Sequence, residues 1–374
     1  MKILLIGNQA STIILFRKKL IEQLVSKGVS VHVLTMDYDK DKFQQISQFG
    51  AMPEQYHFSR SGMNPLSDMV NTVALSRKIK NINPDVVFSF FPKPVIFGTL
   101  AAKLAGVKRI YSLLEGLGFC YTAHLKKDSF KKKMLKKVQT FLYKMTLPRT
   151  NKVLFLNQDD YYDLIVQNHI TLSDAEVIGG IGVNLNEYAY SQPQTTPLHF
   201  GMVSRLLVEK GVREFVQAAK IVKEKYPNAR FSIAGAIDDN PGGITREQLN
   251  IWKSEGHVDF LGQISDVKSY LTDLSVFVLP SYREGIPRST QEAMAIGRAV
   301  ITTDVPGCRE TVQHGLNGLM IPPWDGEALA EAMMAFITDP QQVTMMGKES
   351  RRMAEEKFDE NVATEKLINI LLNN

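Results

Sequence analysis

Two glutamates, Glu284 and Glu292, are the residues whose type and spacing most suggest chemistry. They lie in LPSYREGIPRSTQEAMAIG, which joins an apolar run at 275–280, typical of a buried parallel strand, to a helical pattern at 289–296. Glu284 lies at the turn between the two, and Glu292 lies about one turn into the helix. Gly285 and Pro287 predict a turn that opens this helix. Because ligands bind at the carboxyl ends of parallel strands and helix N-termini attract anions, we expect one carboxylate to meet a ligand beside a phosphate site and the other to bind the vicinal diol of a ribose. The alternative is two ordinary surface glutamates.

Two cations, Arg205 and Lys210, follow an earlier apolar run at 198–204 and precede Gly211 and a helical pattern. Arginine can bind two oxygens at once and lysine acts as a mobile point charge, so the pair suits a diphosphate. The alternative is a solvated loop with ordinary surface charges. In a doubly wound sheet we expect this loop and the Glu284 loop to open on the same crevice.

Apolar runs alternate with amphipathic helical patterns along the whole chain, which predicts an α/β fold with two doubly wound parallel sheets. A Gly-, Asn- and Pro-rich stretch at 179–197 reads as the linker. We therefore expect one domain at 1–185 and a second at 186–359, with the last helix, at 360–374, packing back on the first. The expected strands are 2–6, 30–35, 85–90, 109–114, 152–157, 198–204, 230–235, 258–262, 275–280, 299–303 and 318–322.

The composition suits a globular protein with two domains, because the chain has 374 residues, 44% of them hydrophobic and 22% charged. Cys120 and Cys308 lie far apart, which disfavours a zinc site or a disulfide framework and suits a cytoplasmic protein. No apolar run reaches the length of a membrane span. The N-terminal run is too short for a signal peptide.

The positive charge is concentrated in the first half, where residues 1–185 carry a net charge of +11 and the remainder carries −6. Apolar residues recur at helical spacing through 130–145, between lysines. This pattern predicts a helix that docks on an anionic membrane surface. The alternative is that the apolar stripe packs on the first domain and the lysines are solvated. Nucleic acid is not expected, since stacking aromatic residues are scarce. The lysines assigned to the membrane are Lys131, Lys132, Lys133, Lys136 and Lys137.

Metal binding is not expected. Asp37-Tyr-Asp39 resembles a DxD motif, but we interpret it as a solvated loop, because the positions that an EF-hand requires are not filled. The histidines form no cluster, so we expect neither a metal nor a cofactor.

The second half resembles the nucleotide-sugar domain of retaining glycosyltransferases of family 4, which have two Rossmann-like domains facing a cleft, the GT-B fold. The resemblance rests on SRLLVEKG, FSIAG, VDFLG, the two glutamates and TDVPGCRETV, in the family's order. It implies that Arg205 and Lys210 hold the donor diphosphate, that Glu284 touches the donor sugar and that Glu292 binds the ribose. The other donor-side residues that it implies are Gly235, Leu261, Gly262, Ile264, Gly285, Ile286, Pro287, Ser289 and Thr290.

The first half is similar to bacterial enzymes that extend polyprenyl-diphosphate-linked sugars, through FSRSGMNP at 58–65 and LLEGLGF at 113–119. Many relatives carry a histidine near the end of the fifth strand that faces the reacting sugar, and this chain has Glu115 there. We count Glu115 among the catalytic residues; the alternative is a strand-end carboxylate bonded to nearby backbone N–H groups. The acceptor- or phosphate-side residues are Asn8, Ser11, Arg60 and Gly116.

Together these patterns predict a retaining, metal-independent transferase that moves a hexose or N-acetylhexosamine from a UDP-sugar to a sugar hydroxyl on a polyprenyl-diphosphate acceptor. Its expected setting is the assembly of cell-surface polysaccharide or glycan, at the inner face of the cell membrane. Three alternatives remain: a GT-B enzyme with a soluble acceptor, an epimerase of free UDP-sugar, and a non-catalytic UDP-sugar-binding module. A dehydrogenase is disfavoured because the turn at Gly7 lacks GxGxxG.

Overall fold

The computed structural model describes residues 1–58, 65–123, 125, 128–238 and 242–373, and these form two compact units. Unit 1 comprises Met1–Cys120, Ser129–Ile181 and Asn361–Asn374, and unit 2 comprises Tyr121–Asp128 and Gly182–Glu360. The units therefore divide at Ile181–Gly182, slightly before the expected position. The segment Tyr121–Asp128, which we expected in the first domain, belongs to unit 2. There the Arg283 guanidinium donates to the Tyr121 carbonyl oxygen at 3.3 Å.

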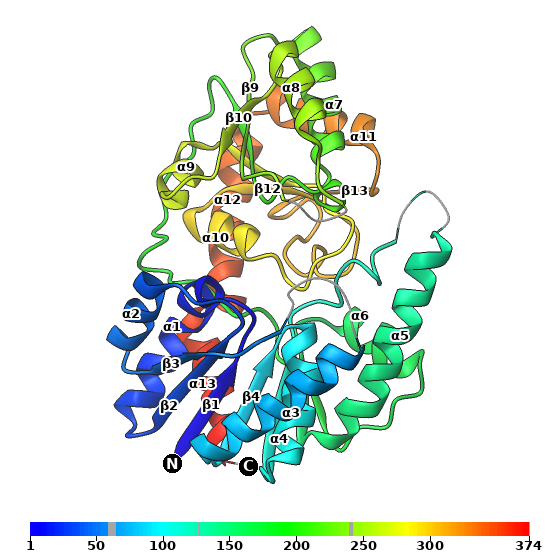
Figure 1. Cartoon of the computed structure of the whole chain (residues 1–374). Coiled ribbons are helices and arrows are strands. Elements are labelled where there is room, and N and C mark those ends of the chain that lie inside the picture. Colours follow the sequence, from blue (N-terminus) through cyan, green and yellow to red (C-terminus); the bar gives the residue numbers. More distant parts are fainter. Residues whose placement is uncertain (59–64, 124, 126–127, 239–241, 374) are drawn as a thin grey trace. The chain divides into compact units, whose positions relative to one another are not determined.

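Unit 1 is built on a seven-stranded sheet in the order β3-β2-β1-β4-β5-β6-β7, in which every pair is parallel (Figure 1). The edge strands β3 and β7 were missed in the sequence: β3 contains Pro53, which a sheet tolerates at its edge, and β7 has only three residues. The strands are β1 Lys2–Ile6, β2 Ser30–Thr35, β3 Met52–Gln55, β4 Val86–Phe90, β5 Arg109–Leu114, β6 Lys152–Phe155 and β7 Ala175–Val177.

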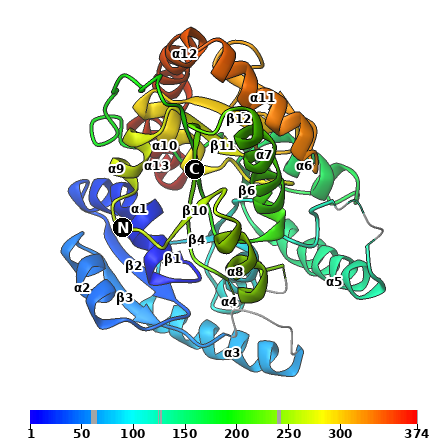
Figure 2. The same cartoon turned by 90° about the horizontal axis from the view of Figure 1, so that it is seen from above.

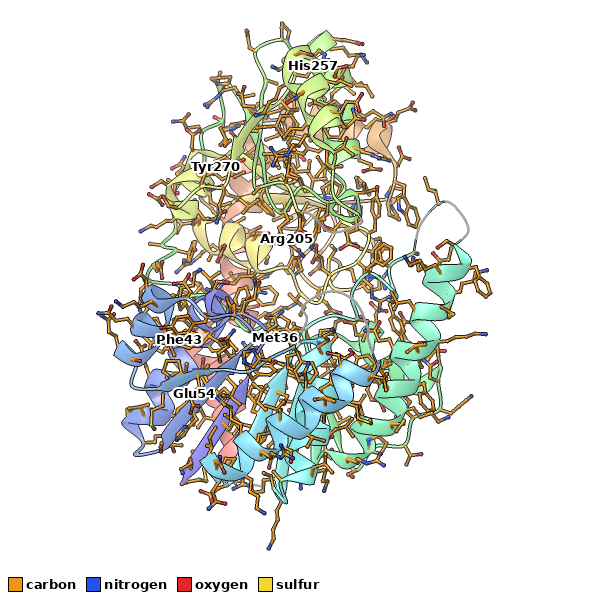
Figure 3. The ribbon with its side chains drawn as sticks, viewed as in Figure 1. Met36, Phe43, Glu54, Arg205, His257 and Tyr270 are labelled. Atoms are coloured by element: carbon orange, nitrogen blue, oxygen red, sulfur yellow. The ribbon has the colours of Figure 1, made fainter. Side chains whose placement is uncertain are left out.

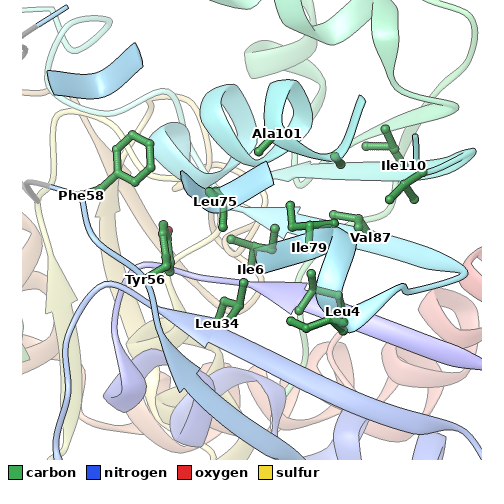
Figure 4. Close-up of a cluster of buried hydrophobic side chains, with 13 residues drawn as sticks. Leu4, Ile6, Leu34, Tyr56, Phe58, Leu75, Ile79, Val87, Ala101 and Ile110 are labelled. Atoms are coloured by element: carbon green, nitrogen blue, oxygen red, sulfur yellow. The ribbon is translucent and has the colours of Figure 1, made fainter. Parts of the chain in front are cut away.

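Helices cover this sheet, and one buried cluster shows how. Leu4, Ile6 and Leu34 from the sheet pack against Leu75 and Ile79 of α3 (Figure 4). The C-terminal helix α13 also belongs here, since Arg109 donates to the Leu371 carbonyl oxygen at 2.8 Å. The helices are α1 Ala10–Ser26, α2 Lys40–Gln48, α3 Pro65–Ile82, η1 Pro94–Gly98, α4 Thr99–Leu104, α5 Phe130–Thr146, η2 Leu147–Arg149, α6 Gln158–Tyr161, η3 Tyr162–Val166 and α13 Glu360–Asn373.

Unit 2 is built on a six-stranded parallel sheet in the order β10-β9-β8-β11-β12-β13. All six strands that the sequence predicts in this half are present. They are β8 His199–Val203, β9 Arg230–Ala234, β10 Asp259–Gly262, β11 Val276–Leu279, β12 Ala299–Thr303 and β13 Gly318–Ile321.

The helices of unit 2 follow these strands, and α7 and α11 lie side by side (Figure 2). They are η4 Val208–Lys210, α7 Val212–Lys225, α8 Arg246–Glu255, α9 Val267–Asp273, α10 Arg288–Ile296, α11 Gly326–Thr338 and α12 Gln341–Lys357.

Each sheet has one point at which the strand order reverses. In unit 1 it lies between β1 and β4, and in unit 2 between β8 and β11. Loops on either side of such a point diverge and leave room for a ligand. Within the described part of the chain, none of the helices is long and apolar enough to cross a membrane.

Candidate functional site

The reversal point of unit 2 brings the two predicted loops together. Strands β8 and β11 are neighbours, with Phe200 opposite Val276 and Gly201 opposite Phe277, so their carboxyl ends open at the same place. The Lys210 ammonium and the Glu284 carboxylate, which come from these two loops, form an ion pair at 2.5 Å. The sequence predicted this convergence, and the structure confirms it.

Backbone contacts fix the two loops against each other. The Tyr282 N–H donates to the Glu209 carbonyl oxygen at 2.9 Å. Gly211 follows Lys210 with a φ of 75°, and a side chain there would overlap the Pro280 carbonyl. The left-handed backbone and the close approach both require glycine. The Gly211 turn thus lets Lys210 lie against the end of β11.

Glu284 is held by three interactions at this point. Its carboxylate accepts from Lys210 and from the Ser281 hydroxyl, the latter at 2.7 Å, and its N–H donates to the Pro306 carbonyl oxygen at 3.0 Å. The side chains of Lys210 and Glu284 are only 17% and 12% exposed. A partly buried, oriented ion pair of this kind suits a group that must meet a charged ligand in a fixed position.

Arg205 lies on the surface of the same loop and is labelled in Figure 3. Its guanidinium pairs with the Asp238 carboxylate at 2.6 Å, and its side chain is 52% exposed. An exposed pair contributes about 0–1 kcal/mol, so Arg205 can leave Asp238 for a bound diphosphate at small cost. The structure thus places Arg205 beside the loop but does not bring it into contact with Lys210 or Glu284.

Helix α10 begins directly after the Glu284 loop and points its N-terminus toward the strand ends. Pro287 takes the N-cap position, and no side chain among the described residues caps this terminus. The first N–H groups therefore lack intrahelical acceptors, which makes an anion site. Thr290 is fully buried, and its hydroxyl has no hydrogen-bond partner in the described part of the chain. Ser289 is half-buried beside it.

Glu292 lies one turn further along α10 and is nearly buried. Arg288 donates to its carboxylate at 2.9 Å, and the Tyr188 hydroxyl is a second partner. Burial raises the pKa of Glu292, and the nearby Arg288 guanidinium opposes this rise. A buried carboxylate with two fixed partners suits a pair of ligand hydroxyl groups.

The remaining donor-side residues stand at the ends of β9 and β10 or in the Glu284 loop. A side chain on Gly235 would overlap the Ser204 carbonyl oxygen, so glycine is needed for packing at this position. The Gly235 N–H donates to the Gly262 carbonyl oxygen at 2.8 Å, whereas Leu261 is 48% exposed and Ile264 is half-buried. In the Glu284 loop, Gly285, Ile286 and Pro287 are buried.

In unit 1, Glu115 does not have the surroundings that we expected. Its carboxylate is buried at the end of β5 and pairs with the guanidinium of Arg17, which is also buried and lies over the Phe90 ring. The alternative that we named for Glu115 was a carboxylate bonded to nearby backbone N–H groups. In the structure its partner is the Arg17 side chain instead. Because the buried Arg17 guanidinium already occupies this carboxylate, the arrangement favours a positioning role for Glu115 over a catalytic base. Gly116 follows it with a φ of 123°.

The other expected unit 1 residues surround the β1–α1 turn. Asn8 accepts from the Thr12 hydroxyl at 3.2 Å, and Ser11 stands in the first turn of α1. The Ala10 N–H donates to the Asp37 carboxylate at 2.8 Å, so a carboxylate already occupies the helix terminus beside these acceptor- or phosphate-side residues. Arg60 lies outside the described residues.

Two aspartates of the loop after β2 cap the N-termini of helices. The Asp37 carboxylate accepts from the Ala10 N–H of α1, and the Asp39 carboxylate accepts from the N–H groups of Asp41 and Lys42 of α2 at 3.1 Å each. The segment is a loop between β2 and α2 with Tyr38 63% exposed, as we expected, and the capping roles add a structural function to it. Across the described ranges, no group of three or more His, Cys, Asp or Glu side chains could hold a metal ion.

Helix α5 carries the predicted lysines, with one correction. Lys131, Lys133 and Lys137 are exposed and Lys136 is half-buried, but Lys132 is only 5% exposed and its ammonium lies over the Phe119 ring. The predicted apolar stripe is largely exposed. The helix packs through Lys132, Tyr143 and Thr146, so the reading in which the stripe packs on unit 1 is wrong. The exposed stripe residues are Phe130, Met134, Val138, Phe141 and Met145.

Sequence reasoning missed three partners of the site. Arg288 stands four residues before Glu292 on the same helix, a spacing at which ion pairs form, so its signal was present. Tyr188 and Arg17 are far from Glu292 and Glu115 in the chain, and no local pattern connects them.

Comparison with known proteins agrees with this geometry. Residues 186–353 match the family "Glycosyl transferases group 1", and residues 2–157 match "Glycosyl transferase 4-like". The chain is 29% identical, over 99% of its length and 98% of the relative, to the N,N'-diacetylbacillosaminyl-diphospho-undecaprenol alpha-1,3-N-acetylgalactosaminyltransferase of Campylobacter jejuni. It is 25% identical to a UDP-Gal:alpha-D-GlcNAc-diphosphoundecaprenol alpha-1,3-galactosyltransferase of Escherichia coli, over 76% of this chain and 74% of the relative.

Solved structures share the fold. HepE from Anabaena, in complex with UDP-glucose, superposes with a TM-score of 0.79 at 18% identity over 100% of both chains. The sucrose-phosphate synthase of Thermosynechococcus elongatus superposes with a TM-score of 0.77 at 17% identity, over 99% of this chain and 98% of the synthase chain. From the two family matches, the two parallel-sheet units and these relatives, the chain belongs to the family 4 glycosyltransferases with the GT-B fold.

Proposed function

We propose that the protein transfers a hexose or N-acetylhexosamine from a UDP-sugar to a hydroxyl group of a sugar carried on a polyprenyl diphosphate, with retention of configuration. Two relatives that match most of the chain are named for transfer to undecaprenyl-diphosphate-linked sugars. The observation that carries the proposal is the convergence of Lys210, Glu284 and the uncapped α10 N-terminus at one reversal point. This arrangement suits a ligand that is a diphosphate with a sugar attached.

The leaving group is the nucleoside diphosphate, which gains negative charge as the bond between the donor sugar's anomeric carbon and the phosphate oxygen breaks. Lys210, Arg205 and the α10 N–H groups would stabilise that charge. The unpartnered Thr290 hydroxyl is available as a further donor to a phosphate oxygen. Glu292 would accept the ribose hydroxyl groups, and Glu284 would accept from the donor sugar.

Retention then follows attack from the same face that the diphosphate leaves. The acceptor oxygen bonds to the anomeric carbon, and its proton moves to the departing phosphate oxygen. Neither Glu284 nor Glu115 suits a covalent nucleophile: Glu284 is already hydrogen-bonded to Lys210 and Ser281, and Glu115 is buried against Arg17. The test is the anomeric configuration of the product by NMR; an inverted linkage would refute retention.

We further propose that the reaction needs no metal, because two cations and a helix N-terminus can neutralise the diphosphate. Full activity after exhaustive treatment with a chelator is the expected result. Loss of activity that only a divalent cation restores would refute this.

The transfer itself is tested with a panel of UDP-sugars and a synthetic polyprenyl-diphosphate sugar, followed by mass spectrometry. A mass increase of one hexose or N-acetylhexosamine on the lipid is expected. Transfer to a soluble acceptor alone, epimerisation of free UDP-sugar, or UDP binding with neither hydrolysis nor transfer would each contradict the proposal and identify the alternative class.

A lipid-borne acceptor requires access to a membrane, and α5 fits that role. Its apolar side chains are exposed, Phe130 at 82% and Phe141 at 61%, beside exposed lysines. Each lysine near an anionic surface contributes on the order of 1 kcal/mol. We expect the triple substitution Lys131→Glu, Lys133→Glu and Lys137→Glu to abolish sedimentation with anionic vesicles.

The matched control makes the same charge change on three exposed lysines of unit 2, Lys220, Lys253 and Lys268. This control should sediment as the unaltered protein does. Equal behaviour of the two triple variants would refute docking through α5.

A further inference from the structure

Helix α3 presents an unusual distribution of side chains in its first two turns. Its outward face is apolar, with Leu66 74% exposed, Met69 63% and Val70 66%, whereas Asp68 and Thr72 are each only 6% exposed. The inward Thr72 hydroxyl is satisfied by donating to the Asp68 carbonyl oxygen at 2.6 Å. Asp68 and Thr72 therefore face the protein, whereas the three apolar side chains face away from it, as does the exposed Ser67 between them.

This outward face is one continuous stripe. Val73, 41% exposed, follows the other three, so the positions fall at i, i+3, i+4 and i+7, which is a single side of a helix. Scattered apolar side chains on a surface need no explanation, but a contiguous stripe marks a place where an apolar partner binds. The sequence pattern gave no sign of this, because it does not show which face the helix buries.

The stripe belongs to the same layer of unit 1 as α5. Both α3 and α5 pack against η1, and α4 lies between them in Figures 1 and 2. Helix α5 adds its own exposed apolar stripe and the exposed Lys131, Lys133 and Lys137. Apolar stripes bordered by lysines match a surface that is anionic outside and apolar within, which is a lipid bilayer.

We propose that the outward stripe of α3 inserts into an anionic lipid bilayer together with α5, so that unit 1 is held by two helices rather than one. This rests on the docking of α5 proposed above and adds a second contact, whose role is apolar. In this arrangement α5 supplies charge and apolar area, and α3 supplies apolar area alone. Two separate contacts fix the tilt of unit 1 on the surface, which a single helix leaves free to rotate about its axis.

The native cysteines allow a direct test. The chain has two, Cys120 and Cys308, and both are buried, so a cysteine added on the surface can be labelled selectively. We would place an NBD fluorophore at Val70→Cys and, as the matched control on the same helix, at the exposed Lys80→Cys. Vesicles of equal parts phosphatidylglycerol and phosphatidylcholine should shift the Val70 probe to the blue. Brominated acyl chains should quench it, and the Lys80 probe should change little.

A partitioning measurement complements the probe. Replacing Leu66, Met69, Val70 and Val73 by serine removes apolar area that is exposed in the protein alone, so the fold should persist. Partitioning onto the same vesicles should fall by roughly tenfold or more. The control replaces exposed apolar side chains of unit 2, Ile251 and Met345, by serine and should partition normally.

The outcomes separate this inference from the proposed function. If the protein binds vesicles through α5 while the Val70 probe is unchanged and the serine variant partitions normally, the α3 contact is refuted and α5 docking stands. If the Val70 probe shifts without vesicles as the protein concentration rises, a second copy of the chain covers the stripe and the inference is overturned. If the protein binds no vesicles, both membrane contacts fail, and transfer measured in detergent still tests the enzyme.

Discussion

Replacing Lys210 by alanine gives the sharpest test of the site. Lys210 and Glu284 form a 2.5 Å pair with side chains only 17% and 12% exposed. The substitution removes a cation from the diphosphate and also leaves Glu284 with Ser281 as its hydrogen-bond donor. A preorganised group of this kind contributes about 2–4 kcal/mol to the transition state, so kcat should fall roughly 30- to 1000-fold.

The assay must separate the two effects of that substitution. Binding of UDP and of uridine is measured by titration calorimetry, and turnover by UDP release. Lys210→Ala should weaken the binding of UDP and leave the binding of uridine nearly unchanged, because uridine has no phosphate. Exposed Lys220→Ala on α7 serves as the control.

A double variant distinguishes a ligand contact from a merely structural pair. If Lys210 only neutralises Glu284, then Glu284→Gln with Lys210→Ala should bind UDP as well as Glu284→Gln alone. If Lys210 contacts the diphosphate, the double variant should bind UDP more weakly. Equal affinities of the two variants, or wild-type turnover in Lys210→Ala, would refute the assignment.

Three further outcomes follow from burial and charge. Burial raises the pKa of Glu292, so as pH falls Glu292 should take up a proton at a higher pH than a free glutamate and UDP binding should weaken with it; Glu292→Gln should bind UDP weakly without this dependence on pH, and calorimetry at a series of pH values checks this. Burial lowers the pKa of His199, so the unfolded state takes up the proton first as pH falls below 6.5; the melting temperature should therefore drop there, and by less in His199→Gln, in which the drop left by His32 remains. Glu115→Gln leaves Arg17 buried without its ion-pair partner and should cost about 3–5 kcal/mol of stability by thermal unfolding. Turnover of the folded Glu115→Gln protein should stay within about tenfold of wild type. A much larger loss of turnover, with no loss of stability, would show that Glu115 acts as a catalytic base.

The fold was largely predictable because parallel strands buried on both faces are almost continuously apolar. All six strands of unit 2 were predicted, and so were β1, β2, β4, β5 and β6. The two missed strands, Met52–Gln55 and Ala175–Val177, lie at sheet edges, where burial is partial and the apolar signal is weak. The same limit explains α3: a helical pattern shows that two faces exist but not which one the sheet covers.

The candidate site was predictable where one loop held all of its parts. Glu284 and Pro287 lie between a strand and a helix that the sequence defines, and Glu292 lies in that helix, so the turn and the helix that begins after it were predictable from local rules. The interaction partners of the charged side chains could not be predicted from these local rules. Arg17 reaches Glu115 across 98 positions of the chain, and Asp37 reaches Ala10 across 27, and in each case the contact changed the expected role.

The sequence alone determined that the chain forms two parallel α/β sheets and that one half carries a cationic loop and an acidic strand–turn–helix. These properties depend on hydrophobic periodicity and turn residues, which act over a few neighbours. The sequence placed the loops of Lys210 and Glu284 on the same crevice, and the tertiary structure decided that the two side chains pair directly with each other. It also decided that Lys132 is buried while the outward apolar stripe of α3 and that of α5 are exposed. Burial and charge pairing depend on which distant segments pack together, and that is settled only when the whole chain has folded.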